Sequence, residues 1–161
     1  MDNHAPNLDK LFETYSDIVT EEYKSAILDL KNAENVYTAP TIDVSEASII
    51  EAASHVEECS AYYGMVCKIA GLSSSAYALA EGRYKQLYRE ALGRSEGKNE
   101  AAREAFAATE TAEYLNDLLF FESASKLFAA LERSARVAAD SSRKIADLVQ
   151  SHHITEVGNK Y

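Results

Sequence analysis

The sequence predicts an all-α fold, a helical bundle with a long C-terminal helix. Three observations favour it. The 161 residues include only six Gly and two Pro, far fewer turn residues than a β-rich domain needs. Hydrophobic residues make up 47% and charged residues 26%, which is ordinary for a globular protein. Apolar residues recur at three- and four-residue spacing along most of the chain. The length suits one domain, which we expect over residues 1–161.

The first helix is expected over residues 7–34. Its apolar stripe runs from Leu8 to Leu30 at helical spacing. The surrounding segment is acidic, because residues 1–50 carry ten acids and three bases. A loop should follow this helix, since Pro40 disfavours helical backbone at the residue before it.

Residues 43–93 are expected to form two helices. Asp43 and Glu46, three residues apart, have the pattern of a capping box at a helix start. Gly71 would end the first of these helices as a C-terminal cap. The serines at 73–75 would then cap the second helix.

Single residues inside this segment carry further expectations. Gly82 costs a helix about 1 kcal/mol relative to Ala, which predicts a close packing contact there. Cys59 and Cys67 lie about 12 Å apart on one helix, too far for a disulfide, so reduced thiols are expected. His55 and Cys59 have a spacing that can hold a metal, but two ligands are too few.

The region 99–152 is expected to form one long helix, either continuous or with a kink near Thr109–Thr111. No Gly or Pro occurs between residues 100 and 157. Large apolar residues repeat at heptad spacing, which is typical of a helix that packs along its length. The chain's shorter helices should not cover this stripe, so further copies of the chain are expected to bury it. The residues assigned to this oligomer interface are Tyr114, Phe121, Phe128, Leu131, Ile145 and Val149.

Motifs of catalysis were sought and are absent from the sequence. There is no G-x-x-x-x-G-K-[ST] phosphate loop, no G-x-G-x-x-G turn, no C-x-x-C pair and no H-E-x-x-H. We therefore expect a protein that is not an enzyme and holds no cofactor or metal. No basic-apolar leader and no run of about 20 apolar residues occurs, so we expect a cytoplasmic protein without a membrane partner.

Two groups of basic residues are candidates for binding phosphates. The first combines cations with aromatic rings, as single-stranded nucleic acid requires: Arg83, Tyr84, Lys85, Tyr88, Arg89 and, just beyond, Arg94. Its alternative interpretation is a half-buried Tyr pair flanked by solvated charges. The second group lies in a C-terminal third with six bases and four acids: Lys126, Arg133, Arg136, Arg143 and Lys144. It suits phosphates, or equally the acidic first helix of a neighbouring subunit.

Over residues 45–150 the chain resembles the UvsY family of recombination mediators from T4-like bacteriophages. The resemblance rests on the basic, Tyr-containing helix from Arg83 to Arg94, the Leu- and aromatic-rich segment from Asp117 to Leu131, and the pair Ser142-Arg143. It implies helical subunits that form rings, bind single-stranded DNA and help to load a recombinase. By resemblance the DNA-facing residues would be Lys85, Arg89, Arg94, Arg136, Arg143 and Lys144.

The leading hypothesis is a non-catalytic, ring-like, single-stranded-DNA-binding recombination mediator that works with recombination proteins, in the host cytoplasm if phage-encoded. The alternative is an oligomeric helical protein-interaction module, such as a phage-encoded inhibitor or assembly factor, with no nucleic-acid role. The net charge of −10 and the long heptad face favour the alternative, because an acidic protein repels nucleic acid and a heptad face suits a protein partner.

Overall fold

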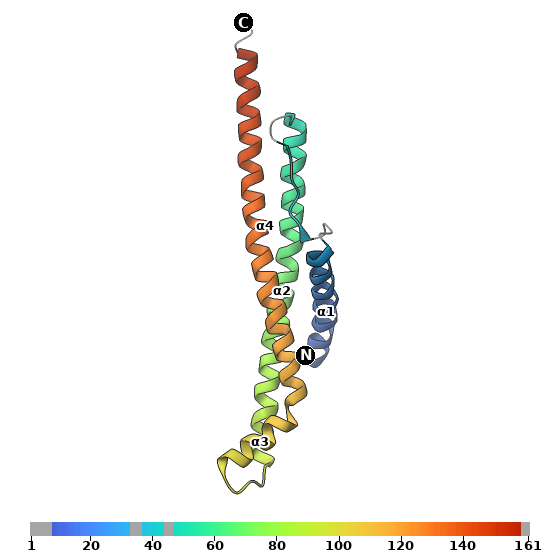
Figure 1. The fold of residues 1–161 in the computed structure, drawn as a ribbon, viewed down its shortest axis with the longest axis vertical. Coiled ribbons are helices and arrows are strands. Elements are labelled where there is room, and N and C mark those ends of the chain that lie inside the picture. Colours follow the sequence, from blue (N-terminus) through green and yellow to red (C-terminus); the bar gives the residue numbers. More distant parts are fainter. Residues whose placement is uncertain (1–7, 33–36, 44–46, 159–161) are drawn as a thin grey trace, which may run out of the picture. The chain divides into compact units, whose positions relative to one another are not determined.

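The computed structural model describes residues 8–32, 37–43 and 47–158. These contain α1 (Leu8–Asn32), α2 (Ile49–Arg94), α3 (Glu100–Glu110) and α4 (Ala112–Gly158), with no strand among the described residues (Figure 1). The all-α prediction and the long C-terminal helix are confirmed. The chain forms two compact units, which we call the first unit (Met1–Lys24 with Ala70–Leu127) and the second unit (Ser25–Ile69 with Phe128–Tyr161).

In the first unit, aromatic contacts hold α1 against α4. The ring of Phe12 on α1 meets Phe121 edge-on, with 5.6 Å between centroids, and Tyr23 meets Phe120 at 5.2 Å. Phe12 and Val19 are buried, in agreement with the apolar stripe predicted for this helix. The observed start and end of α1 lie within two residues of the predicted range, and residues 33–36 lie outside the described part of the chain.

Residues 49–94 form one helix, so the prediction of two helices divided at Gly71 is wrong. The serines expected to start a new helix instead bond back to the preceding turn. Ser73 Oγ donates to the Ala70 carbonyl at 3.0 Å, and Ser75 Oγ donates to the Gly71 carbonyl at 3.0 Å. Because these hydroxyl groups are satisfied inside the helix, they do not compete with its backbone ladder.

The start of α2 is a capping box, five residues later than predicted. Ser48 Oγ accepts a hydrogen bond from the Glu51 N–H at 3.2 Å, and the Glu51 carboxylate accepts one from the Ser48 N–H at 2.8 Å. This reciprocal pair satisfies backbone donors that the first turn leaves without partners. Asp43 lies before the helix, and Glu46, the other half of the predicted box, falls outside the described residues.

The expected kink near Thr109–Thr111 is present and separates α3 from α4. Thr111 has φ −109° and ψ 12°, and its Oγ1 donates to the Ala107 carbonyl at 2.8 Å. This buried hydroxyl competes with the helical backbone for the same carbonyl, which also accepts the Thr111 N–H at 3.0 Å. At the other end of α3, the Asn99 side chain accepts from the Ala102 N–H at 2.8 Å and caps the helix.

In the second unit, α2 and α4 run antiparallel, and the segment 37–43 packs against them. The sulfur of Cys67 lies 3.8 Å from Oε1 of Glu132. Cys59, which precedes Cys67 on α2, contacts Ser142, which follows Glu132 on α4, so the two helices run in opposite directions. Tyr62 donates its hydroxyl hydrogen to the Tyr37 carbonyl at 2.8 Å. These contacts build the core of the unit around α2, α4 and the chain that leads into α2.

Candidate functional site

Arg83, the first residue of the basic-aromatic group, is held by aromatic rings of its own chain. Its guanidinium carbon lies 5.6 Å from the ring centroid of Phe12 and 5.1 Å from that of Tyr114. Both distances fall within the range of cation–π attraction. This arginine therefore links α2 to α1 and α4 within the first unit.

Tyr84 and Tyr88 form a ring pair on α2. Their centroids are 5.8 Å apart, the planes are tilted by 37°, and both side chains are half-buried. The geometry matches the alternative interpretation, in which the two rings pack on one another beside solvated charges. Both side chains therefore remain partly accessible to solvent.

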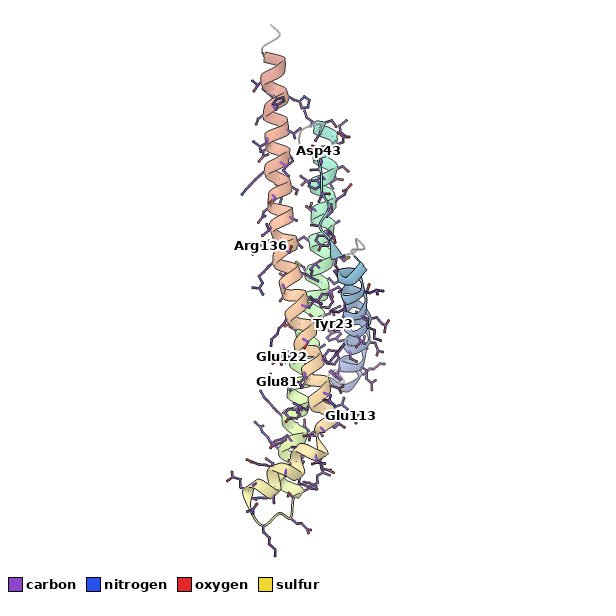
Figure 2. All side chains as sticks on the ribbon, viewed as in Figure 1. Tyr23, Asp43, Glu81, Glu113, Glu122 and Arg136 are labelled. Atoms are coloured by element: carbon purple, nitrogen blue, oxygen red, sulfur yellow. The ribbon has the colours of Figure 1, made fainter. Side chains whose placement is uncertain are left out.

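The cations next to these rings are mostly paired with acids of the same unit. Lys85 Nζ donates to Glu81 at 2.6 Å, and Arg94 lies 3.8 Å from Glu110. Figure 2 marks Glu81. Arg89 is exposed, and no acidic partner lies near it among the described residues. Because exposed pairs of this kind contribute only about 0.2–1 kcal/mol, a phosphate could compete for the paired cations.

The second basic group is divided between the two units. Lys126 belongs to the first unit and donates to Glu122 at 2.6 Å, a contact that raises the pKa of its ammonium group. In the second unit Arg143 lies 3.7 Å from Asp140. The remaining three residues of the group are exposed on α4: Arg133, Arg136 and Lys144.

The stripe assigned to the oligomer interface is largely covered by the chain itself. Phe128 is fully buried at 0% exposure and faces the Tyr37 ring at 5.9 Å, and Phe121 is covered by Phe12. Val149 is buried, and the other three assigned residues are half-buried: Tyr114, Leu131 and Ile145. The expectation that the chain's other segments leave this stripe uncovered is therefore wrong for Phe121, Phe128 and Val149, which are buried within the chain.

Sequence reasoning missed the opposite side of α4 in the second unit, which we call the outer face. Eight residues at alternating four- and three-residue spacing are all exposed: Ala130, Ser134, Val137, Ser141, Lys144, Leu148, Ser151 and Thr155. Val137 is 65% exposed and Leu148 is 64% exposed. The signal in the sequence is a second heptad repeat, which is weaker than the first because only Val137 and Leu148 are large and apolar and the other residues are small or polar.

The glycines of α2 at 64, 71 and 82 have no close packing contact with the described part of the chain. A Cβ added at Gly64, Gly71 or Gly82 would meet nothing within 4 Å. The close contact predicted at Gly82 is therefore not found in this structure. All three positions are exposed, so each glycine lowers the stability of the helix and no contact within the chain offsets this loss.

His55 and Cys59 lie together in the second unit, as their spacing predicts. The Cys59 sulfur lies 3.9 Å from Nδ1 and 3.7 Å from Nε2 of His55, and both residues are buried. Burial raises the pKa of the Cys59 thiol, so it is a poor nucleophile at neutral pH. Within the described ranges, no three His, Cys, Asp or Glu side chains gather in a way that could hold a metal ion.

Among the described residues, none of the helices is sufficiently long and apolar to span a bilayer. Comparison of the chain with protein-family models, with curated proteins and with solved structures gave no match.

Proposed function

We propose that this chain is a non-catalytic helical interaction module that associates with a second copy of itself through the outer face of α4. The observation that carries the proposal is the exposed 3-4 repeat on that face, which continues over residues 130–155. A sustained repeat of this period lets two helices stay in contact along their length. Two of its residues, Val137 and Leu148, are large and apolar and are 65% and 64% exposed, which supports burial against a partner.

The composition of the outer face favours close approach of another helix. Small residues separate Val137 from Leu148, so a neighbouring backbone meets little steric resistance between them. Burying a large apolar side chain contributes about 1.5–3 kcal/mol, and both of these are now mostly in water. The face can therefore supply several kcal/mol to association without disturbing the core.

Charge complementarity favours a second copy as the occupant. If two outer faces pair antiparallel about an axis near residues 139–140, Arg133 of each copy lies opposite Asp147 of the other. Ala130 then lies opposite Leu148, a small residue against a large one. Asp140 falls near the axis, where its own Arg143, 3.7 Å away, offsets the repulsion between the two carboxylates.

Light scattering of variants tests this proposal. Val137→Glu and Leu148→Glu should dissociate the complex at micromolar protein, because each places a charge in the contact. Ile50→Glu is the matched control, since Ile50 is an 81% exposed apolar residue on another helix of the same unit. A monomer in the unsubstituted chain, or dissociation by all three variants alike, contradicts the proposal.

A charge exchange tests the antiparallel geometry itself. Arg133→Asp and Asp147→Arg should each weaken association, because each creates two pairs of like charges. The double variant should restore association by re-forming both pairs with reversed polarity. If the double variant does not restore association, the antiparallel pairing of Arg133 with Asp147 is wrong, even if the chains still associate.

The second candidate function is binding of single-stranded DNA, as the resemblance to recombination mediators implies. The observation that favours it is Arg89, exposed on α2 beside the Tyr84–Tyr88 ring pair. Rings and a cation on one helix suit base stacking and phosphate contact. In a mediator, assembly through α4 and DNA binding through α2 would both be required.

Fluorescence anisotropy with labelled oligo-dT at two salt concentrations tests this candidate. Arg89→Ala should weaken binding and lower the logarithmic salt slope by about 0.7 for the lost phosphate contact. Glu81→Gln should strengthen binding, because it releases Lys85 from its 2.6 Å pair. If no binding is seen even at low salt, the interaction module alone remains.

A further inference from the structure

A cavity of about 300 Å³ lies in the first unit, between α1 and α4. Its volume is at the lower end of the range of small-ligand sites. One face of each helix supplies the walls, because the lining residues of each helix are three or four positions apart. Three aromatic rings, one carboxylate and two hydroxyl groups line the cavity: Phe12, Ser16, Thr20, Asp117, Phe120 and Phe121. None of them belongs to the outer face of α4 or to the basic groups.

The aromatic rings hold one another in place by edge-to-face contacts. Phe121 lies 5.6 Å from Phe12 and 5.1 Å from Phe120, measured between ring centroids. Phe120 also meets Tyr23, which Figure 2 labels, at 5.2 Å. Phe12 and Phe121 are buried, whereas Phe120 is half-buried and is the most accessible of the three rings in the cavity wall. The wall is therefore preformed, and it is made largely of aromatic carbon.

Asp117 gives this aromatic cavity a negative charge that the chain does not balance. Its side chain is exposed, and no ion pair or hydrogen bond joins its carboxylate to the described residues. No Lys or Arg lines the cavity; the guanidinium of Arg83 lies 5.6 Å from the Phe12 ring centroid but is not part of the lining. The adjoining part of α1, residues 8–24, carries five acids and two bases. The local field therefore favours a cation.

The chemistry of the walls determines which kind of cation fits. A divalent metal ion requires several oxygen ligands, and the cavity has only one carboxylate. A primary ammonium group is strongly hydrated, and aromatic carbon cannot replace the water that its N–H groups would lose. A quaternary ammonium group has no N–H to satisfy, so its methyl groups can pack against rings while its charge is attracted by them.

We propose that this cavity binds a quaternary ammonium group, with its methyl groups against the aromatic wall and the Asp117 carboxylate balancing its charge. Such a group combines the two properties that the cavity selects, an apolar surface and a positive charge. Two sources carry it: a free choline-like molecule, and a trimethylated lysine side chain on a partner protein. The proposal stands independently of association through α4 and of DNA binding.

The experiment titrates the full chain with choline, with acetylated and amidated trimethyl-lysine, and with the uncharged isostere of choline in which carbon replaces the nitrogen. Carbon-13 NMR of the phenylalanine rings is the readout, and Phe120→Leu identifies the Phe120 signal among the five phenylalanines. Choline should shift this signal. The isostere has the same shape without the charge, so it should bind about fivefold more weakly or worse.

Two exposed acids on α4 provide a matched pair of variants. Asp117→Asn removes the carboxylate that lines the cavity and should weaken choline binding about fivefold. Glu113→Gln removes a carboxylate one turn earlier, labelled in Figure 2, which does not line the cavity, and should leave the affinity nearly unchanged. Neither side chain is part of the core, so both variants should fold. Phe120→Leu keeps an apolar side chain without a ring and should weaken binding about two- to fivefold.

The order of the affinities identifies the source of the group. Tighter binding of choline than of blocked trimethyl-lysine indicates a free small molecule, and the reverse order indicates a protein side chain. Equal weakening by Asp117→Asn and Glu113→Gln would mean that the probes respond only to the general negative charge, and the proposal would be overturned. It would also fail if the uncharged isostere bound as tightly as choline, or if neither cation moved the Phe120 signal at millimolar concentration.

Discussion

Replacing Phe128 with Ala tests where the main apolar stripe of α4 is buried. The ring is fully buried and packs 5.9 Å from the Tyr37 ring. Truncation of a Phe in such a site removes its transfer free energy and leaves a cavity, at a cost of about 3–5 kcal/mol. A domain is commonly stable by only about 5–15 kcal/mol, so this loss is large.

Urea denaturation followed by circular dichroism measures the effect. With a slope of about 2 kcal/mol per molar urea, the midpoint for Phe128→Ala should fall by about 2 M. Ile50→Ala, on α2 of the same unit and 81% exposed, is the control and should change stability by less than about 0.5 kcal/mol.

The protein concentration separates core from interface in the same experiment. If Phe128 is buried inside the chain, its contribution is present in the monomer, and the loss of stability is the same at every concentration. If Phe128 is buried between copies, the loss should shrink on dilution, because the unsubstituted complex would itself dissociate. A loss below about 1 kcal/mol, or one that disappears on dilution, would refute the intramolecular assignment.

Three further results are expected. Arg83→Ala should lower the free energy of unfolding by about 1 kcal/mol through loss of two ring contacts, and Arg83→Lys should lose less, as thermal melts will show. Ser48→Ala should lower the free energy of unfolding by about 1 kcal/mol through loss of the hydroxyl that accepts the Glu51 N–H, as thermal melts will show. The Ser48 N–H, and after it the Ser48 hydroxyl, lower the pKa of Glu51, so the contact of this carboxylate stabilises the helix start above the ordinary carboxyl pKa and is lost as the pH falls through the lowered value. With a thiol reagent at about pH 8, Cys59 should react more slowly than the half-buried Cys67, because burial raises its pKa; equal rates would contradict its placement.

Helix content and the ends of α1 were predictable because local patterns determine them. The apolar stripe of α1 has a single interpretation, and the break at Thr111 lies within the predicted range. Gly71 was misleading because glycine stops a helix only where the backbone gains by leaving it. Here the residues around Gly71, Ala70 and Ser73, are buried when the helix continues. Their packing outweighs the cost of about 1 kcal/mol that glycine has in a helix interior relative to Ala.

The candidate sites were less predictable because their partners come from distant parts of the sequence. The pattern around Arg83 correctly indicated rings beside cations, yet the rings that hold Arg83 come from α1 and α4. Lys85 was expected to face a phosphate, and its nearest acid was one helical turn away at Glu81. Sequence spacing identifies which residues share a face, but it does not show which partner occupies that face.

The two repeats on α4 show why sequence alone did not reveal that the larger one is mostly covered within the chain. Both have heptad spacing, and only the one with Phe121 and Phe128 has large rings. A partner on the same chain is held near these rings by covalent connection, so burying them costs no translational entropy of association. The repeat with the largest apolar side chains is therefore buried within the chain in preference to a contact between copies. The association that we propose would instead use the weaker repeat around Val137 and Leu148, where small side chains allow close approach and the pairing of Arg133 with Asp147 would determine the antiparallel direction.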